Sequence, residues 1–254
     1  MERTTRDRVI IFDFDGTITV GDGPVRAYAE QVAARIVPRL AQDFRDAVED
    51  GLRNPDAEHS HGAIDDYDLV RRAALAHGAD SSVLSAAYLA SRELLATEQA
   101  VISAPFLSQG SGHDLASWLH RLKTLAYLVL ATNAPSTGLD RALAVLGVTD
   151  AFDEVRTSVG KPAGMETLVE EMLLRGPVLS VGDVWLNDLE PVRVRGGTTA
   201  FLTRGGVGDA RATLCADTLD GLAPGITAWA TATDAPVAPH DHPAPTTTTA
   251  KADL

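Results

Sequence analysis

Cysteine is almost absent from this sequence, and so are the features of exported or membrane-bound chains. Because Cys215 is the single cysteine among 254 residues, no disulfide can form within the chain. The charged start MERTTRDR is followed by an apolar run that is far too short for a signal peptide or a membrane span. We therefore expect a cytoplasmic protein without a membrane partner.

Positive charge is also scarce. Lysine and arginine number 22 against 35 aspartates and glutamates, which gives a formal net charge of -13. This excess disfavours nucleic acid or an anionic membrane surface as the main partner, because both repel an acidic protein. A negatively charged substrate would need positive charge supplied locally. The composition, 45% hydrophobic and 22% charged, is otherwise that of an ordinary globular protein.

Short apolar runs alternate with helix-like segments along much of the chain. The runs cover residues 8–12, 124–131, 178–182 and 198–203, and the helix-like segments cover 112–122, 136–147, 163–175 and 188–195. Strands that alternate with helices form a parallel sheet covered on both faces. The pattern therefore predicts an α/β protein.

Residues 20–108 interrupt this alternation, since they carry no strand signals and are rich in Ala, Leu, Arg and Glu. We predict helices at 24–36, 38–52, 64–77 and 82–98. The segment is interpreted as a helical insert into a core formed by residues 1–19 and 109–232. From residue 233 the composition shifts to Pro, Thr, Ala and Asp, so we expect 233–254 to be a disordered tail. Five arginines of the insert could face an anionic substrate, although a solvated helix surface explains most of them: Arg26, Arg53, Arg71, Arg72 and Arg92.

Polar residues follow the predicted strands at the point where each strand ends. Ligands bind outside the carboxyl ends of open parallel sheets, so these side chains should converge on one edge. They are Asp13, Asp15, Gly16 and Thr17 after the first strand, Thr132 and Asn133 after the second, and Gly182, Asp183, Asn187 and Asp188 after the third, with Lys161 in the connection before it. Converging carboxylates repel one another unless a cation binds, and oxygen ligands favour Mg²⁺. The sequence therefore predicts a site for magnesium and phosphate together.

These residue types suit phosphoryl transfer. Asp13 would attack phosphorus and form an aspartyl-phosphate, while Asp15 would protonate the leaving oxygen and later deprotonate the attacking water. Magnesium and Lys161 would offset the repulsion between carboxylate and phosphate. The predicted catalytic residues are Asp13, Asp15, Thr132 and Lys161. The predicted phosphate-binding residues are Gly16, Thr17, Thr132, Asn133 and Lys161, and the predicted metal ligands are Asp13, Asp15, Asp183 and Asp188.

The motifs resemble those of a known family. DFDGT from Asp13, the strand-terminal Thr132, GKP at Lys161 and GDVWLND ending at Asp188 follow the order of the four motifs of the haloacid dehalogenase (HAD) superfamily, over residues 8 to about 225. The resemblance implies a Rossmann-like three-layer core with a helical C1-type cap, as in phosphoglycolate-phosphatase-like members. The acids of the last motif lie five apart where many relatives use four. Either Asn187 or Asp188 could therefore fill the outer metal position.

Three functions follow from these motifs. The leading hypothesis is a Mg²⁺-dependent phosphomonoester hydrolase that acts on a small phosphorylated metabolite, with the insert closing over the site. A phosphomutase or phosphotransferase is the close alternative, and a non-catalytic phosphate-binding regulatory module is the third. Dehalogenation is disfavoured, because that branch of the superfamily lacks the aspartate present here as Asp15.

Overall fold

The computed structural model describes residues 6–54, 62–97, 114–204, 206 and 208–232. The expected tail at 233–254 lies outside the described residues, and so does the predicted boundary between insert and core at residues 108 and 109. The division into core, insert and tail therefore stays a prediction.

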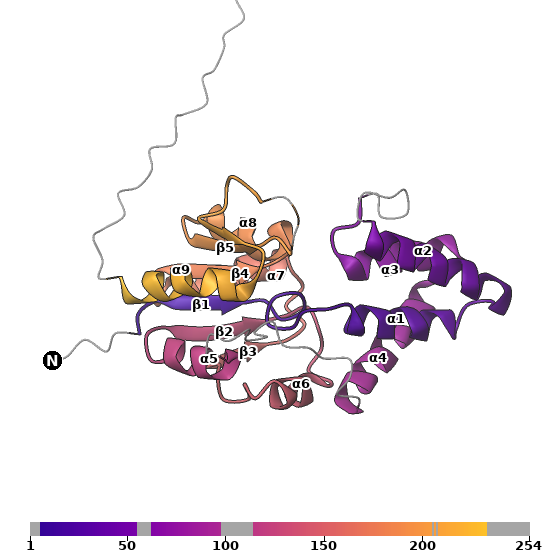
Figure 1. The fold of residues 1–254 in the computed structure, drawn as a ribbon, viewed down its shortest axis with the longest axis horizontal. Coiled ribbons are helices and arrows are strands. Elements are labelled where there is room, and N and C mark those ends of the chain that lie inside the picture. The colour runs from indigo at the N-terminus through magenta and orange to yellow at the C-terminus, as the bar shows by residue number, and fades with distance from the viewer. Residues whose placement is uncertain (1–5, 55–61, 98–113, 205, 207, 233–254) are drawn as a thin grey trace, which may run out of the picture.

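Six parallel strands form one sheet in the described part of the chain, in the order β3-β2-β1-β4-β5-β6 (Figure 1). The strands are β1 (Val9–Phe12), β2 (Tyr127–Ala131), β3 (Glu154–Arg156), β4 (Val178–Gly182), β5 (Thr198–Leu202) and β6 (Leu214–Ala216). The four predicted strands are present, and the α/β prediction is confirmed. The sequence analysis missed β3 and β6, because each has only three residues, EVR and LCA, which are too few to be recognised as a strand.

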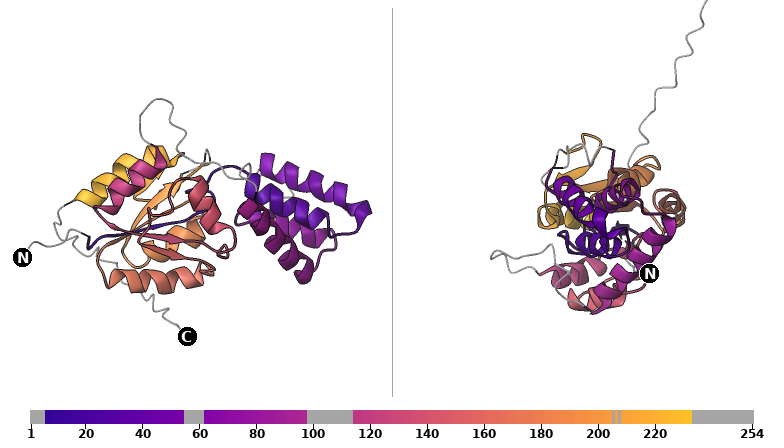
Figure 2. Two further views of the ribbon diagram at one scale, coloured as in Figure 1. Left: turned by 90° about the horizontal axis from the view of Figure 1, so that it is seen from below. Right: turned by 90° about the vertical axis from the view of Figure 1, so that its right-hand side faces the viewer.

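Helices cover both faces of the sheet and make the core three layers deep. They are α5 (Leu115–Lys123), α6 (Leu139–Val145), α7 (Ala163–Leu173), α8 (Glu190–Arg193) and α9 (Leu219–Thr231). Ile10 and Phe12 of β1 pack into one apolar cluster with α5, α6 and α9. The alternate residues Val9 and Ile11 pack into another cluster with α7 and α8, because successive strand side chains point to opposite faces. Figure 2 shows the central sheet between these two layers.

The insert is helical, as predicted. It contains α1 (Gly23–Ala33), the short 3-10 helix η1 (Pro38–Leu40), α2 (Ala41–Arg53), α3 (Asp66–Ala76) and α4 (Ser81–Thr97). These helices bury an apolar cluster of their own around Val32, Phe44 and Val70. Asp65 caps α3, where its carboxylate accepts a hydrogen bond from the backbone N–H of Asp68 at 2.7 Å. The insert lies beyond the end of β1, where the chain leaves the sheet and enters α1 (Figure 1).

Candidate active site

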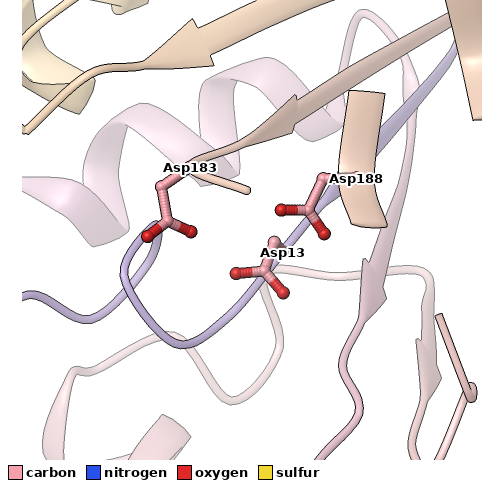
Figure 3. Close-up of side chains that lie close together, drawn as sticks. All are labelled: Asp13, Asp183 and Asp188. Atoms are coloured by element: carbon pink, nitrogen blue, oxygen red, sulfur yellow. The ribbon is translucent and has the colours of Figure 1, made fainter. Parts of the chain in front are cut away.

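Three aspartates converge at the carboxyl end of the sheet. Asp13 follows β1 and Asp183 follows the neighbouring strand β4, and the backbone N–H of Asp13 donates to the carbonyl oxygen of Val181 at 2.9 Å. Asp188 comes from the single π-helical turn Trp185–Leu189 that leads into α8. One carboxylate oxygen from each of the three aspartates lies within 4.8 Å of the other two. Figure 3 shows the three carboxylates turned toward a common point.

Two glycines allow this convergence. Gly16 has a φ of +89°, and a Cβ atom built on it would lie 2.2 Å from a carboxylate oxygen of Asp183. A Cβ atom on Gly182 would lie 2.4 Å from the Cβ of Asp188. Both glycines belong to the sequence motifs, and their role here is to leave room for the carboxylates.

Lys161 neutralises part of the cluster. Its ammonium lies 2.6 Å from Asp13 Oδ1 and 2.7 Å from Asp188 Oδ1, and its side chain is 2% exposed. Burial alone would lower the pKa of this lysine, but the two carboxylates outweigh burial and hold the pKa above its ordinary value. Lys161 therefore stays charged and contacts two of the three carboxylates.

Burial makes the remaining negative charge of the three aspartates energetically unfavourable. Burial, followed by the charges of Asp13 and Asp188, raises the pKa of Asp183 well above its usual range. Burial likewise raises the pKa of Asp188 to about 6 against the opposing effect of Lys161. Outside the cluster, Arg204 Nη1 lies 3.2 Å from Asp183 Oδ2. Oxygen-only donors with surplus negative charge fit a hard divalent cation such as Mg²⁺, so Asp13, Asp183 and Asp188 could hold one.

Asp188, rather than Asn187, belongs to the cluster. The backbone N–H groups of both residues donate to the carbonyl oxygen of Val184, at 3.1 Å for Asn187 and 2.9 Å for Asp188. Asp188 Oδ2 also accepts from the N–H of Val184 at 3.0 Å, and its side chain is buried. Asn187 lines the cavity beside the cluster. The five-residue spacing of the two acids is therefore accommodated by the π-helical turn.

The structure does not bring Asp15, the fourth predicted metal ligand, into this cluster. Asp15 Oδ2 lies 3.8 Å from the guanidinium of Arg92, which belongs to α4 and is 0% exposed. Burial raises the pKa of Asp15 to about 6, although Arg92 opposes this shift. A carboxyl group with this pKa can hold and release a proton near neutral pH, which suits the acid-base role that the sequence analysis gave it.

The other predicted residues lie around the same point. Asn133 Oδ1 accepts from the backbone N–H of Lys161 at 2.7 Å, and Thr132 Oγ1 accepts from the backbone N–H of Ala134 at 3.0 Å. Gly16, Thr132, Asn133 and Lys161 line the cavity described below. Thr17 differs from the predicted set, because it is fully buried and its hydroxyl lies 3.5 Å from Asp183 Oδ1 instead of lining that cavity.

A cavity of about 400 Å³ opens above the cluster and extends to the insert. The site residues line one side, and residues of α1, α3 and α4 line the other. The volume is in the range of small-molecule sites. The sequence analysis missed several of its residues: Tyr28, Asp65, Asp66, Tyr67, Asp68, Tyr88 and Arg204. A signal existed only for Arg204, which directly follows the predicted strand at 198–203.

The five insert arginines named in the sequence analysis fall into two groups. Arg26, Arg53, Arg71 and Arg72 make ion pairs with Asp22, Glu49 or Asp68, as partly solvated helix residues do. The interpretation as a solvated helix residue is wrong for Arg92. This side chain is completely buried, and its guanidinium nitrogens have no hydrogen-bond partner among the described residues.

A family model of haloacid dehalogenase-like hydrolases matches residues 8–192. The chain belongs to this family. The HAD assignment made from the four motifs is therefore confirmed, although it defines neither the subfamily nor the reaction. No curated protein matches the chain. In the described part of the HAD chain, no helix is long and apolar enough to cross a membrane.

Solved HAD structures share the fold. The HAD phosphatase of Thermococcus onnurineus has 20% sequence identity and a TM-score of 0.53, and the match covers 85% of this chain and 95% of that one. The HAD-hydrolase YfnB of Bacillus subtilis, solved bound to magnesium, has 15% identity and a TM-score of 0.56 over 87% and 99% of the two chains. The L-2-haloacid dehalogenase RSc1362 has 20% identity and a TM-score of 0.52 over 87% and 98%. At these identities the likeness establishes the fold alone.

Proposed function

We propose that this HAD hydrolase is a magnesium-dependent phosphomonoester hydrolase that acts on a small phosphorylated metabolite through an aspartyl-phosphate on Asp13. The observation that carries the proposal is the separation of two kinds of carboxylate. Asp13 lies in the metal-binding cluster, whereas Asp15 lies outside it, beside Arg92, with a pKa of about 6. Phosphate ester hydrolysis needs both a nucleophile and a group that gives and takes a proton.

The residues would act in two steps. A carboxylate oxygen of Asp13 attacks phosphorus, the ester P–O bond breaks, and Asp15 gives its proton to the leaving alkoxide. Asp15 then takes a proton from water, which attacks phosphorus and releases inorganic phosphate together with the free Asp13 carboxylate. Lys161 orients Asp13 through the contact at 2.6 Å. A Mg²⁺ ion held by Asp13, Asp183 and Asp188 would supply positive charge that offsets the charge of the phosphate group.

Asp15 also argues against a dehalogenase. A halide leaves without needing a proton, so the acid half of the role proposed for Asp15, with its pKa of about 6, would have no task in that reaction. The carboxylate cluster would moreover repel the departing halide. For a regulatory module that binds phosphate without turnover, the intact set of Asp13, Asp15, Lys161 and Asp183 would be unnecessary.

Two variants test the proposal with p-nitrophenyl phosphate and magnesium. Asp13→Asn should abolish phosphate release and leave no phosphorylated protein detectable by intact mass after an acid quench. Asp15→Asn should lower turnover by about a hundredfold or more and retain one phosphoryl group, because the water attack stalls. Asp150→Asn, at an exposed position, is the matched control and should behave as the wild type.

Two outcomes would overturn the proposal. One is phosphate release by Asp13→Asn at the wild-type rate, and the other is full wild-type activity in excess chelator. If the phosphoryl group passes to a sugar hydroxyl instead of water, an isomerised sugar phosphate appears in place of inorganic phosphate, and the protein is a mutase or phosphotransferase.

A further inference from the structure

The insert contributes three tyrosines to the wall of the cavity, one from each of three helices. Tyr28 lies in α1, Tyr67 in α3 and Tyr88 in α4, and all three line the cavity. The ring centroids are 5.6 Å apart for Tyr28 and Tyr88, and 6.0 Å apart for each of the other two pairs. Tyr88 meets both other rings edge-on, at 86° and 82°. The insert thus presents an aromatic cluster to the space above the site.

The charges in the cavity wall are unbalanced toward the negative. Each cationic side chain of the wall is already paired with carboxylates: Lys161 with Asp13 and Asp188, Arg204 with Asp183 and Asp66, and Arg71 with Asp68. An anionic group on the substrate, other than the reacting phosphate, would therefore find no uncommitted cation in this wall.

Asp65, by contrast, is a carboxylate without a counter-charge. It makes no ion pair within the described ranges, and its carboxylate accepts the capping hydrogen bond from the N–H of Asp68 at 2.7 Å. Burial raises the pKa of Tyr88 to about 12; the positive charge of Arg92 opposes this rise, whereas Asp15, Tyr28 and Asp65 add to it. Asp65 and Tyr88 both line the cavity.

Arg92 places no side chain in the cavity wall, although its positive charge opposes the rise in pKa of Tyr67 and Tyr88. It is completely buried and lies outside the cavity wall, and its guanidinium faces Asp15 at 3.8 Å. The hydroxyl of Tyr67, which does belong to the wall, is buried and has no hydrogen-bond partner among the described residues.

We propose that the substrate carries a cationic nitrogen in its leaving group, so that the protein hydrolyses phosphomonoesters of small amino alcohols, with the ammonium held by Tyr28, Tyr67, Tyr88 and Asp65. A cation is attracted to the faces of aromatic rings and to a carboxylate, whereas a carboxylate-bearing leaving group is repelled by the same wall. The inference rests on the proposed phosphatase activity and names its substrate class. The chemical steps are those already given, and the amino alcohol leaves with its ammonium unchanged.

Matched substrates isolate the charge. Choline phosphate and ethanolamine phosphate are compared with dimethylbutyl phosphate, in which carbon replaces the nitrogen of choline phosphate, and with phosphoglycolate, whose leaving group is anionic. We expect kcat/KM for the cationic esters to exceed that for the uncharged isostere by about tenfold or more, and phosphoglycolate to be the poorest of the four. Equal or lower kcat/KM for choline phosphate than for its isostere would overturn the inference.

Two variants locate the preference. Tyr88→Leu removes the ring but keeps an apolar side chain, and Asp65→Asn removes the charge but keeps a good helix cap. Each should reduce the preference for choline phosphate over its isostere by about threefold or more, with the loss confined to the cationic ester. The matched control is Asp80→Asn, because Asp80 also accepts backbone N–H groups at a helix start, in α4, but lies outside the cavity wall. An unchanged preference in both test variants would contradict the assignment.

A reference substrate, p-nitrophenyl phosphate, distinguishes the proposed phosphatase activity from the proposed substrate class. If the wild type hydrolyses p-nitrophenyl phosphate but shows no preference for the cationic esters, the substrate class is wrong and the phosphatase stands. If it hydrolyses no ester, the phosphatase proposal fails, and calorimetry with choline and with dimethylbutanol tests the cationic site alone. Binding of choline that is at least about tenfold tighter, and weakened in Asp65→Asn, supports the site, and equal binding overturns it.

Discussion

Asp183→Asn should make the metal-free protein more stable while removing its response to magnesium. The carboxylate oxygens of Asp183, Asp13 and Asp188 lie within 4.8 Å of one another. At that separation and an effective dielectric constant of about 20, each pair of carboxylates repels by about 3 kcal/mol. Asparagine has nearly the same shape as aspartate, so the substitution removes the charge and leaves the packing intact.

The net gain is smaller than the sum of the two repulsions. Arg204 lies 3.2 Å from Asp183 and would lose this partner, although Asp66 remains 3.5 Å away from it. The raised pKa of Asp183, caused first by burial and then by Asp13 and Asp188, shows that the unfavourable effects prevail. We therefore expect the free energy of unfolding in chelator to rise by about 1–3 kcal/mol, which corresponds to roughly 2–4 °C in Tm for each kcal/mol.

Magnesium should reverse this order of stability between the wild type and Asp183→Asn. An ion at about a hundred times its dissociation constant stabilises the wild type by about 2.7 kcal/mol, whereas a variant without one ligand gains little. Thermal unfolding at neutral pH, with chelator and with magnesium, measures both effects. The matched control is Asp66→Asn, which also removes a partner of Arg204 but lies outside the cluster, so it should keep the wild-type response to metal. A variant that is less stable than the wild type in chelator, or that keeps the full response to magnesium, would refute the reasoning.

Three further substitutions test separate parts of the site and the insert. Lys161→Met should destabilise the protein by about 3–5 kcal/mol in chelator and by less with magnesium, since it leaves buried carboxylates unpaired; equal losses in urea titrations under both conditions would contradict this. Gly16→Ala should lower phosphatase turnover at least about tenfold, because its Cβ would lie 2.2 Å from an Asp183 oxygen, and wild-type kcat would contradict that reading. Asp68→Asn should lower the free energy of unfolding by about 1–2 kcal/mol at neutral pH. Burial raises the pKa of Asp68, but hydrogen bonds from two arginines outweigh it and hold the pKa below its ordinary value, so this difference should vanish as the pH falls below about 4, and a difference that persists there would exclude the ionised carboxylate as its source.

The central strands and the residues at their carboxyl ends were predictable, because both can be recognised from short local stretches of sequence. An apolar run such as 178–182 needs only its own residues to be recognised as a buried strand, and the parallel arrangement then fixes which edge Asp13 and Asp183 share. The edge strands β3 and β6 were missed for the opposite reason. Their three residues are held by pairing with β2 and β5, which no local pattern reveals.

Side-chain direction was harder to predict than position. Asp13 and Asp15 lie two apart, and an extended chain would point both carboxylates to one side. The chain bends directly after β1 instead, where the N–H groups of Ile18 and Thr19 both donate to the carbonyl oxygen of Phe14 at 2.9 Å. This tight loop separates the two carboxylates, so one joins the cluster with Asp183 and Asp188 and the other faces the insert.

Arg92 shows what the sequence contained and what it could not contain. It follows Tyr88 by four residues in α4, so helical periodicity places both on one face, and a face that carries a tyrosine lining the cavity is no solvated surface. The periodicity of α4 thus groups Arg92 with Tyr88, but only the structure shows that this face is turned away from solvent. Its partner could not be found in this way, because Asp15 belongs to a different element and comes within 3.8 Å only when the insert lies over the sheet edge. A buried guanidinium is costly unless a charge faces it, and a buried carboxylate has the same need. The ion pair therefore joins the insert to the proposed acid-base residue, and displacement of the insert would leave both charges without their partner.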